Sequence, residues 1–220
     1  MTYKKVDWNK SMWPPSEWER NPTWQMEFIR ASSLISDEHK FIFIHIAKTA
    51  GQSMVRGVFM EEIVDAVNSP GLDAPIDDEK WKDYFKFTFV RNPWDRMVSA
   101  YNYQIGGVPK GNSFSDWLHN FAWDERGNPI NKHWLEQHLH VKRDGPMWVD
   151  FVGRFENLEE DWKKVCRIIG KEWELPHKNY NRGKPRNMSY IDYYDEDTKW
   201  IVAKKFRKDI ELFGYTFEEP

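Results

Sequence analysis

The sequence lacks several features that define common classes of protein. A single cysteine, Cys166, among 220 residues excludes an internal disulfide and a cysteine-based metal cluster. No apolar run is long enough to span a bilayer, and the first residues lack the apolar core of a signal peptide. The net charge of −3 provides no general basic field for nucleic acid. We therefore expect a soluble cytoplasmic protein with no nucleic-acid or membrane partner.

A nucleotide-binding loop of the Walker type is also missing. Such a loop has the pattern Gly-x-x-x-x-Gly-Lys-Ser/Thr, in which a glycine-rich stretch precedes the lysine. In residues 48–53, KTAGQS, the lysine comes before the glycine. This absence argues against an ordinary nucleotide triphosphatase.

Two elements suited to bind anions are present instead, each after a predicted buried strand. Residues 41–46, FIFIHI, lead into residues 48–53, and residues 85–90, FKFTFV, lead into residues 91–101. A strand that ends in a turn and continues as a helix directs backbone N–H groups and the positive end of a helix dipole at one point. Two such points imply a ligand with two anionic groups.

The residue types of both elements fit phosphate. In the first, Gly51 permits close backbone approach, Thr49 and Ser53 offer hydroxyl donors, and Lys48 supplies a mobile charge. In the second, the planar guanidinium of Arg91 can bind a phosphate through two hydrogen bonds, and Asn92 with Pro93 predicts a helix start. Ser99 lies along that helix, where it can join Arg91 at one phosphate.

These residues carry a resemblance to a known family. Residues 45–53 resemble the 5′-phosphosulfate loop, and residues 89–101, FVRNPWDRMVSAY, resemble the 3′-phosphate element, of carbohydrate sulfotransferases that use 3′-phosphoadenosine 5′-phosphosulfate (PAPS). The similarity continues in residues 149–158, 175–179 and 209–215. It implies a three-layer α/β sandwich with a central parallel sheet and a P-loop-like sulfotransferase fold.

The resemblance also implies roles for individual residues. The 5′-phosphosulfate would be held by Lys48, Thr49, Ala50, Gly51, Gln52 and Ser53, and the 3′-phosphate by Arg91 and Ser99. Lys48 would stabilise charge on the leaving oxygen. Arg186 belongs to a basic stretch that either closes over the nucleotide, as a late loop does in the family, or is a solvated loop. The product would be 3′-phosphoadenosine 5′-phosphate (PAP), no metal would be needed, and the acceptor would be a hydroxyl, favoured to be on a saccharide.

The general base is left open by the sequence. Relatives often carry a histidine some two dozen residues before the arginine of the 3′-phosphate element, whereas this chain has VNSPG at residues 67–71. A base must be a carboxylate or an imidazole within reach of the acceptor, and we favour Glu62, Asp65 and His138. The other candidates are Glu61, Asp73, His133 and His140. A solvated helix face for Glu62 and Asp65, and a packing role for His138, are the alternatives.

The predicted organisation is a tryptophan-rich arm over residues 1–38 and one sulfotransferase domain over residues 39–220. Strands are expected at residues 40–47, 85–91 and 149–153, and helices at residues 52–66, 93–104, 113–122, 131–139, 157–169 and 195–213. Asn157 and Glu160 suggest a capping box for the helix at residues 157–169. Cys166 falls on the apolar side of that helix, so we expect it to be buried.

Three functions remain in competition at this point. The leading hypothesis is a PAPS-dependent sulfotransferase, and Trp94, Trp117, Trp123 and Trp134 either line its saccharide cleft or belong to the core. A nucleotide or small-molecule kinase is disfavoured by the missing Walker loop and would need magnesium and ATP. A noncatalytic relative that only binds the nucleotide is kept open by the missing histidine.

Overall fold

The structure, a computed structural model, describes residues 33–59, 78–103, 111–124, 127, 129, 132–142, 146–175 and 188–218. The chain divides into two compact units. Residues 21–91 and 137–180 form the unit that we call the sheet unit, and residues 1–20, 92–136 and 181–220 form the helical unit. The arm at residues 1–38 and the single domain at residues 39–220 stay predictions.

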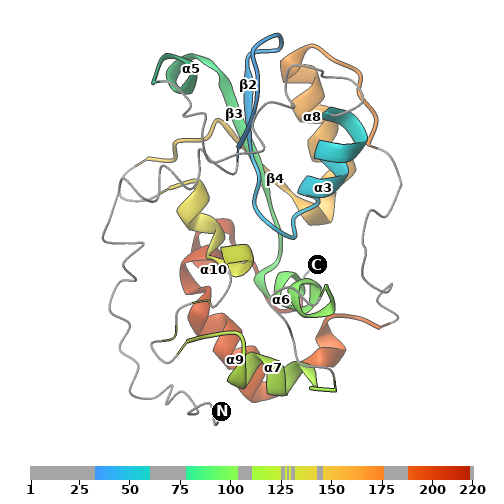
Figure 1. Cartoon of the computed structure of the whole chain (residues 1–220), viewed down its shortest axis with the longest axis vertical. Helices are drawn as coiled ribbons and strands as arrows, with labels where there is room; N and C mark the ends of the chain where they lie inside the picture. Colours follow the sequence, from blue (N-terminus) through green and yellow to red (C-terminus); the bar gives the residue numbers. More distant parts are fainter. Residues whose placement is uncertain are drawn as a thin grey trace. The chain divides into compact units, whose positions relative to one another are not determined.

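The described part of the sheet unit contains a four-stranded sheet in the order β1-β2-β3-β4 (Figure 1). The strands are β1 (Ser33–Ser36), β2 (Phe41–Ile44), β3 (Phe85–Val90) and β4 (Phe151–Arg154). Strands β2, β3 and β4 are parallel, as predicted, whereas β1 is antiparallel to β2. The predicted parallel sheet is therefore confirmed for these three strands, and β1 adds an antiparallel strand at its edge. β1 was missed because its sequence, SLIS, is short and has little apolar patterning.

One face of the sheet carries an aromatic core. Successive side chains of a strand point to opposite faces, so Phe41 and Phe43 of β2 share a face with Phe87 and Phe89 of β3. Three helical segments pack against these rings: α3 (Gly51–Met54), the π-helical turn η1 (Val55–Phe59) and α8 (Leu158–Ile169). The ring of Phe59 in η1 lies 5.9 Å from the ring of Trp162 in α8, measured between centroids, and Figure 1 shows α3 and α8 on the same side of the strands. The phenylalanine-rich strands β2 and β3 thus anchor, in a packed core, the loop that follows β2 and the residue Arg91 that follows β3.

Two residues of α8 and β4 show how tightly this core is packed. Cys166 is buried, as predicted, and burial raises the pKa of its thiol to about 11, which leaves little reactive thiolate. A Cβ atom added at Gly153 would lie 2.4 Å from Cε1 of Phe89. Glycine is therefore required at position 153 if β3 and β4 are to keep their spacing.

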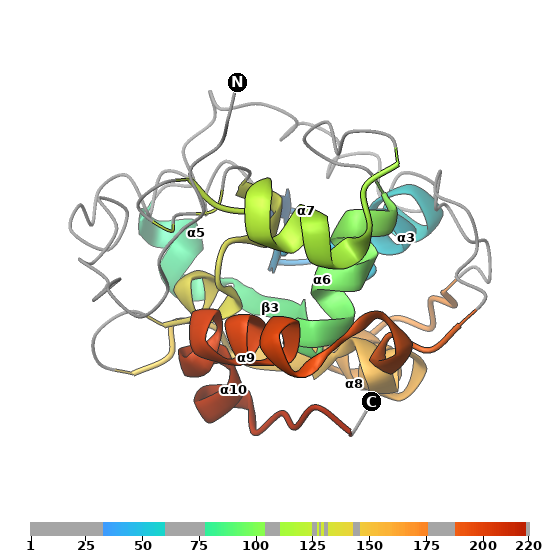
Figure 2. The ribbon, with the colours of Figure 1, turned by 90° about the horizontal axis from the view of Figure 1, so that it is seen from below.

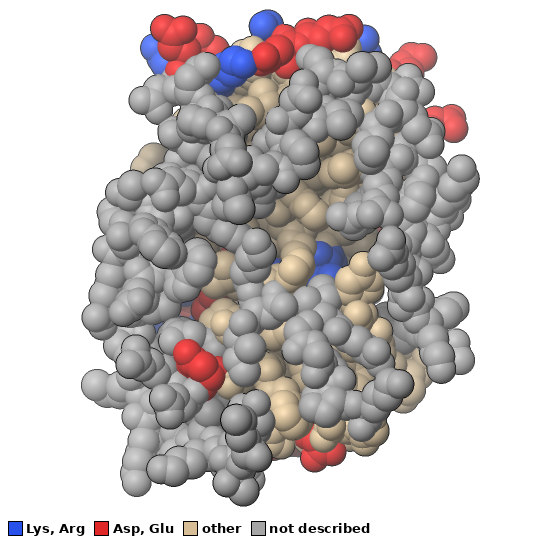
Figure 3. Space-filling model, viewed as in Figure 1, with Lys and Arg blue, Asp and Glu red and all other residues tan. Residues whose placement is uncertain are grey.

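The end of the sheet unit that carries α5 (Asp78–Asp83) is charged. Lys80 Nζ lies 2.7 Å from a carboxylate oxygen of Asp37, and the hydroxyl of Tyr84 donates to the same carboxylate. These contacts lower the pKa of Asp37. Figure 3 shows charges of both signs among the described residues at this end. No helix among the described residues has the length and apolar character needed to cross a membrane.

The helical unit is built around α6 (Pro93–Asn102). This helix contacts α7 (Phe114–Asn120), α9 (Glu196–Lys205) and the short turns η3 (Lys132–Trp134) and η6 (Ile191–Tyr193) (Figure 2). The predicted start of α6 is confirmed, because the side chain of Asn92 accepts a hydrogen bond from the backbone N–H of Trp94 and Pro93 is the first helical residue. α10 (Arg207–Phe213) follows α9.

Several predicted helices differ from the structure. The helix expected at residues 131–139 is two 3₁₀ turns, η3 and η4 (Gln137–His140), and the helix expected at residues 195–213 is broken at Phe206 into α9 and α10. The capping box of Asn157 does not form, because the 3₁₀ turn η5 (Phe155–Asn157) leads into α8 and leaves the side chain of Asn157 without a capping hydrogen bond. The helix expected from residue 52 is described only as far as Phe59.

Candidate active site

The loop after β2 is held in an unusual backbone conformation. Lys48 and Ala50 have φ angles of 71° and 70°, the left-handed region that costs a residue with a Cβ atom about 1 kcal/mol. The hydroxyl of Thr49, which is fully buried, donates to the carbonyl of Ile46 at 2.8 Å. The loop then closes into α3 through a hydrogen bond from the N–H of Ser53 to the carbonyl of Ala50 at 2.9 Å. Local bonds thus maintain a strained turn at the position predicted to bind the 5′-phosphosulfate.

Glycine is needed at position 51 for a reason that the sequence did not reveal. A Cβ atom added there would lie 2.0 Å from Cδ2 and 2.2 Å from Nε2 of His45. The ring of His45 is stacked on Phe43 of β2, with 6.0 Å between the ring centroids. The ring of His45, which follows β2, therefore lies too close to Gly51, the first residue of α3, for a side chain at position 51 unless the ring moves.

Arg91, directly after β3, is fixed at both its backbone and its side chain. Its N–H donates to Oε1 of Gln137 at 2.9 Å, and its carbonyl accepts from Nε2 of Gln137 at 2.8 Å. Its guanidinium donates to the carbonyl of Lys48 at 3.1 Å and lies 4.0 Å from the centre of the Phe155 ring. The guanidinium of the second element is thereby brought to the loop of the first.

The pKa of Lys48 is lowered by its burial and by the proximity of Arg91. Burial, followed by the nearby charge of Arg91, lowers the pKa of the Lys48 ammonium from 10.5 to about 8. Both causes disfavour the charged form, and a bound anion would favour it. The loop after β2 and the start of the segment after β3 thus bring two cations together, one of which has a depressed pKa, and such an arrangement can bind an anion.

The helix after this loop changes its conformation at Val55. α3 has four residues and continues directly as the π-helical turn η1 to Phe59. The first N–H groups of the helix and the positive end of its dipole lie next to the loop, where they add to the charges of Lys48 and Arg91.

The structure describes the positions of only some of the remaining predicted site residues. Ser99 lies on α6 in the helical unit, so its meeting with Arg91 at one phosphate stays a prediction. His138 is buried in η4, directly after Gln137. Of Gln52 the structure describes only the backbone, and Glu62, Asp65 and Arg186 lie outside the described residues. The catalytic roles of Glu62, Asp65 and His138 stay predictions.

The four tryptophans considered for a saccharide cleft belong to the core of the helical unit. Trp94, Trp117, Trp123 and Trp134 are each at most 4% exposed. The indole N–H of Trp94 donates to the carbonyl of Lys199, and that of Trp134 donates to the carbonyl of Ala122. The cleft interpretation was therefore wrong, and the alternative of core packing is confirmed.

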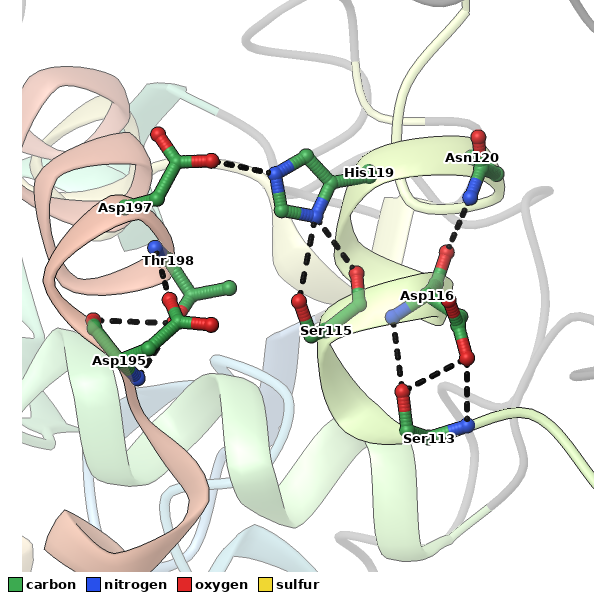
Figure 4. A network of polar contacts seen from close by, with 8 residues as sticks. All are labelled: Ser113, Ser115, Asp116, His119, Asn120, Asp195, Asp197 and Thr198. Carbon is green, nitrogen blue, oxygen red and sulfur yellow. Dashed lines mark hydrogen bonds and ion pairs between the residues drawn. The ribbon is translucent and has the colours of Figure 1, made fainter.

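Two further polar residues of the helical unit have structural contacts. Arg96 is buried and donates to the carbonyls of Leu135 and His133. His119 on α7 donates from Nδ1 to the carbonyl of Ser115, and its Nε2 lies 2.8 Å from the Asp197 carboxylate on α9 (Figure 4). These residues connect elements within the unit.

Sequence reasoning missed Gln137 and Phe155, which both contact Arg91. Gln137 lies in an aromatic-rich stretch where the histidines drew attention, and an amide carries no pattern of its own. Phe155 lies in the run at residues 149–158, which was noted for its resemblance to the family. That resemblance was the signal available for Phe155.

A cationic corner at the carboxyl ends of two parallel strands is an arrangement that can bind phosphate. Comparison with known proteins gives the family. The sulfotransferase family model matches residues 66–216, a range that includes Arg91, Ser99 and the run at residues 149–158. The chain belongs to the sulfotransferase family, and the resemblance inferred from the sequence is confirmed.

Individual relatives extend the match over nearly the whole chain. Carbohydrate sulfotransferase 14 of Danio rerio is 24% identical over 263 residues, covering 97% of this chain and 70% of the relative. The Homo sapiens protein of the same name is 24% identical over 250 residues, covering 92% of this chain and 64% of the relative. An uncharacterised protein of Archaeoglobus fulgidus is 37% identical over 94 residues, or 42% of this chain. This chain thus spans about two thirds of the length of the two curated enzymes, and no solved structure gives a significant match.

Proposed function

We propose that this protein transfers a sulfuryl group from PAPS to a hydroxyl of a carbohydrate. The observation that carries the proposal is the pairing of Lys48 with Arg91, where burial and a neighbouring cation hold the pKa of the lysine near 8. A donor with a phosphosulfate and a separate phosphate is an anionic ligand of the kind that two adjacent cations attract. Membership of the sulfotransferase family and the names of the relatives support sulfate as the transferred group and a saccharide as the acceptor.

The reaction assigned to the site is an in-line displacement at sulfur. The acceptor oxygen forms a bond to sulfur, the bond from sulfur to the bridging phosphosulfate oxygen breaks, and the hydroxyl proton passes to a base. PAP then leaves with the bonding electron pair. As in phosphoryl transfer, the protein contributes mainly positioning and charge stabilisation. Lys48 is suited to stabilise the charge on the leaving oxygen, because its ammonium lies on the loop predicted to hold the phosphosulfate.

The proposal also covers the arrangement of the fold, the metal requirement, the cellular location and the individual site residues. We infer the three-layer, P-loop-like arrangement of the sheet and its helices, a reaction without a metal ion, and a cytoplasmic enzyme. The remaining loop residues from Thr49 to Ser53 would contact the phosphosulfate, Ser99 would contact the 3′-phosphate, and Arg186 would belong to a loop that closes over the nucleotide. His138, Glu62 and Asp65 are the candidates for the base.

A transfer assay tests the proposal. The purified protein is incubated with ³⁵S-labelled PAPS and a panel of saccharides, and label in the acceptor is measured. Lys48→Ala should lower turnover by about 100-fold or more while PAPS binding weakens much less, since removal of one charge-stabilising donor has effects of this size. Lys163→Ala, which removes an exposed lysine of α8, is the matched control and should leave turnover unchanged.

Two results would contradict the proposal. Near-normal turnover of Lys48→Ala would refute the role of that lysine. Binding of PAP without label transfer to any acceptor would instead identify a noncatalytic relative.

A further inference from the structure

We propose that Gln137 is a positioning residue for Arg91, and that Phe155 assists it by fixing the plane of the guanidinium. The inference rests on the proposed function, since it assumes that Arg91 binds the 3′-phosphate of the donor. It adds two residues that act through Arg91, and it assigns a reason for the presence of phenylalanine in the run at residues 149–158.

Gln137 holds the backbone of Arg91 as a neighbouring strand would. Its side-chain amide accepts from the N–H and donates to the carbonyl of the same residue, at 2.9 Å and 2.8 Å. β3 ends at Val90, so this pair of hydrogen bonds replaces the strand pairing that Arg91 no longer receives. Gln137 is fully buried, and its bonds are therefore shielded from competition by water.

The guanidinium of Arg91 is fixed by two further contacts. It stacks on Phe155, which belongs to the turn η5 directly after β4, and it donates to the carbonyl of Lys48. Arg91 is only 9% exposed. With its backbone and its side-chain plane both held, the arginine loses little conformational freedom when an anion binds, and such preorganisation strengthens binding.

The competing explanation is purely structural. Gln137 begins η4, so its bonds to Arg91 also attach that turn to the sheet. A structural role would lower stability without altering how the protein distinguishes ligands that have a 3′-phosphate from ligands that do not. The test therefore compares PAP with adenosine 5′-phosphate, which lacks that group.

Calorimetric titration of both nucleotides into the full chain separates the two roles. Gln137→Met keeps the side-chain length but removes both bonds, and we expect PAP to bind about tenfold more weakly and adenosine 5′-phosphate within about twofold of wild type. Thr88→Val is the matched control, because Thr88 is buried on β3 and its hydroxyl donates to the carbonyl of Ile44. It should lower the melting temperature and leave both affinities unchanged.

The variant Gln137→Glu should make the affinity for PAP depend on pH, which a purely structural role of Gln137 does not predict. In Gln137→Glu, an ionised carboxylate can accept from the N–H of Arg91 but cannot donate to its carbonyl, whereas the protonated acid can do both. The affinity for PAP relative to wild type should therefore recover as the pH is lowered. Phe155→Leu should weaken PAP binding by a smaller factor, about threefold.

The outcomes are distinguishable. Equal weakening of PAP and adenosine 5′-phosphate by Gln137→Met, or no weakening of either, overturns the positioning role while the proposed function stands. If Gln137→Met does not fold, Gln137→Glu decides, and a pH-independent affinity ratio overturns the role. If wild type does not bind PAP, the proposed function is refuted and the inference is refuted with it.

Discussion

Lys48 is a residue whose native environment opposes its own charge. Its backbone is left-handed, its ammonium is partly buried, and Arg91 lies near it. Because the pKa is 10.5 in an unfolded chain and about 8 in the folded one, this lysine lowers the stability of the folded state below about pH 8. That cost decreases as the pH rises from about 8 towards 10.5. An anion that binds the loop would remove this cost. We therefore explain the presence of a destabilising lysine at position 48 by a role in anion binding.

The pH dependence of PAP binding follows from the same pKa. Below about pH 8 the free protein already carries the ammonium, and this group adds no pH dependence. Above that value the free lysine is neutral, a bound anion restores the charge, and binding takes up a proton. The association constant should then fall by up to about tenfold per pH unit. Calorimetry from about pH 6 to about pH 10 measures the profile.

Lys48→Arg is the control for this profile, because its guanidinium stays charged across the range. The association constant of this variant for PAP should vary little above pH 8, whether PAP binding by the variant is strong or weak. A wild-type profile that is flat across pH 8 would show that the charge of Lys48 does not contribute to donor binding.

At the scale of elements, α9 depends on a capping box. The carboxylate of Asp195 accepts from the N–H of Thr198 at 2.8 Å, and the hydroxyl of Thr198 accepts from the N–H of Asp195 at 3.0 Å (Figure 4). The hydroxyl of Thr198 also donates to the Asp195 carboxylate at 2.6 Å, and this bond, followed by the one from the Thr198 N–H, lowers the pKa of Asp195. Their stabilisation is present above the ordinary pKa of 3.8 and is lost as the pH falls below it.

We expect Asp195→Ala to destabilise the protein by about 1 kcal/mol, the usual cost of a lost cap. The melting temperature at neutral pH should fall by about 2 to 4 °C. Asp192→Ala removes the same charge from the exposed turn η6 and is the control. Equal melting temperatures for the two variants would mean that the box does not stabilise α9.

The elements show what the sequence could and could not predict. β2 and β3 were predictable because continuous apolar runs end at clear turn signals, and α6 because Asn92 and Pro93 mark its start. β1 was not, since four residues of mixed polarity resemble a loop. The break between α9 and α10 at Phe206 was missed because apolar spacing continues across it, and tertiary packing decided the outcome.

The same contrast applies to the site. Lys48, Gly51 and Arg91 lie in patterns with a physical reason that is visible in the sequence, and the structure brings the loop and the arginine together. Gln137 has no such pattern, because its role arises from contact with a residue 46 positions away. The tryptophans illustrate the opposite error, since four indoles that suggested a saccharide cleft are packed in the core.

For the whole molecule, net charge and ligand charge oppose each other. The chain carries a net charge of −3, and PAPS is a polyanion, so long-range attraction does not favour their association. Affinity must come from cations that act at short range, and Lys48 with Arg91 is the pair on which our proposal relies. Loss of either should therefore have a large effect.

The most direct test of this account is calorimetric titration of PAP into the wild-type chain and into Arg91→Ala at neutral pH. The account predicts one PAP per chain, with a dissociation constant of about 100 µM or below, and at least about tenfold weaker binding by the variant. No detectable binding by wild type, or equal affinities of the two proteins, would contradict it.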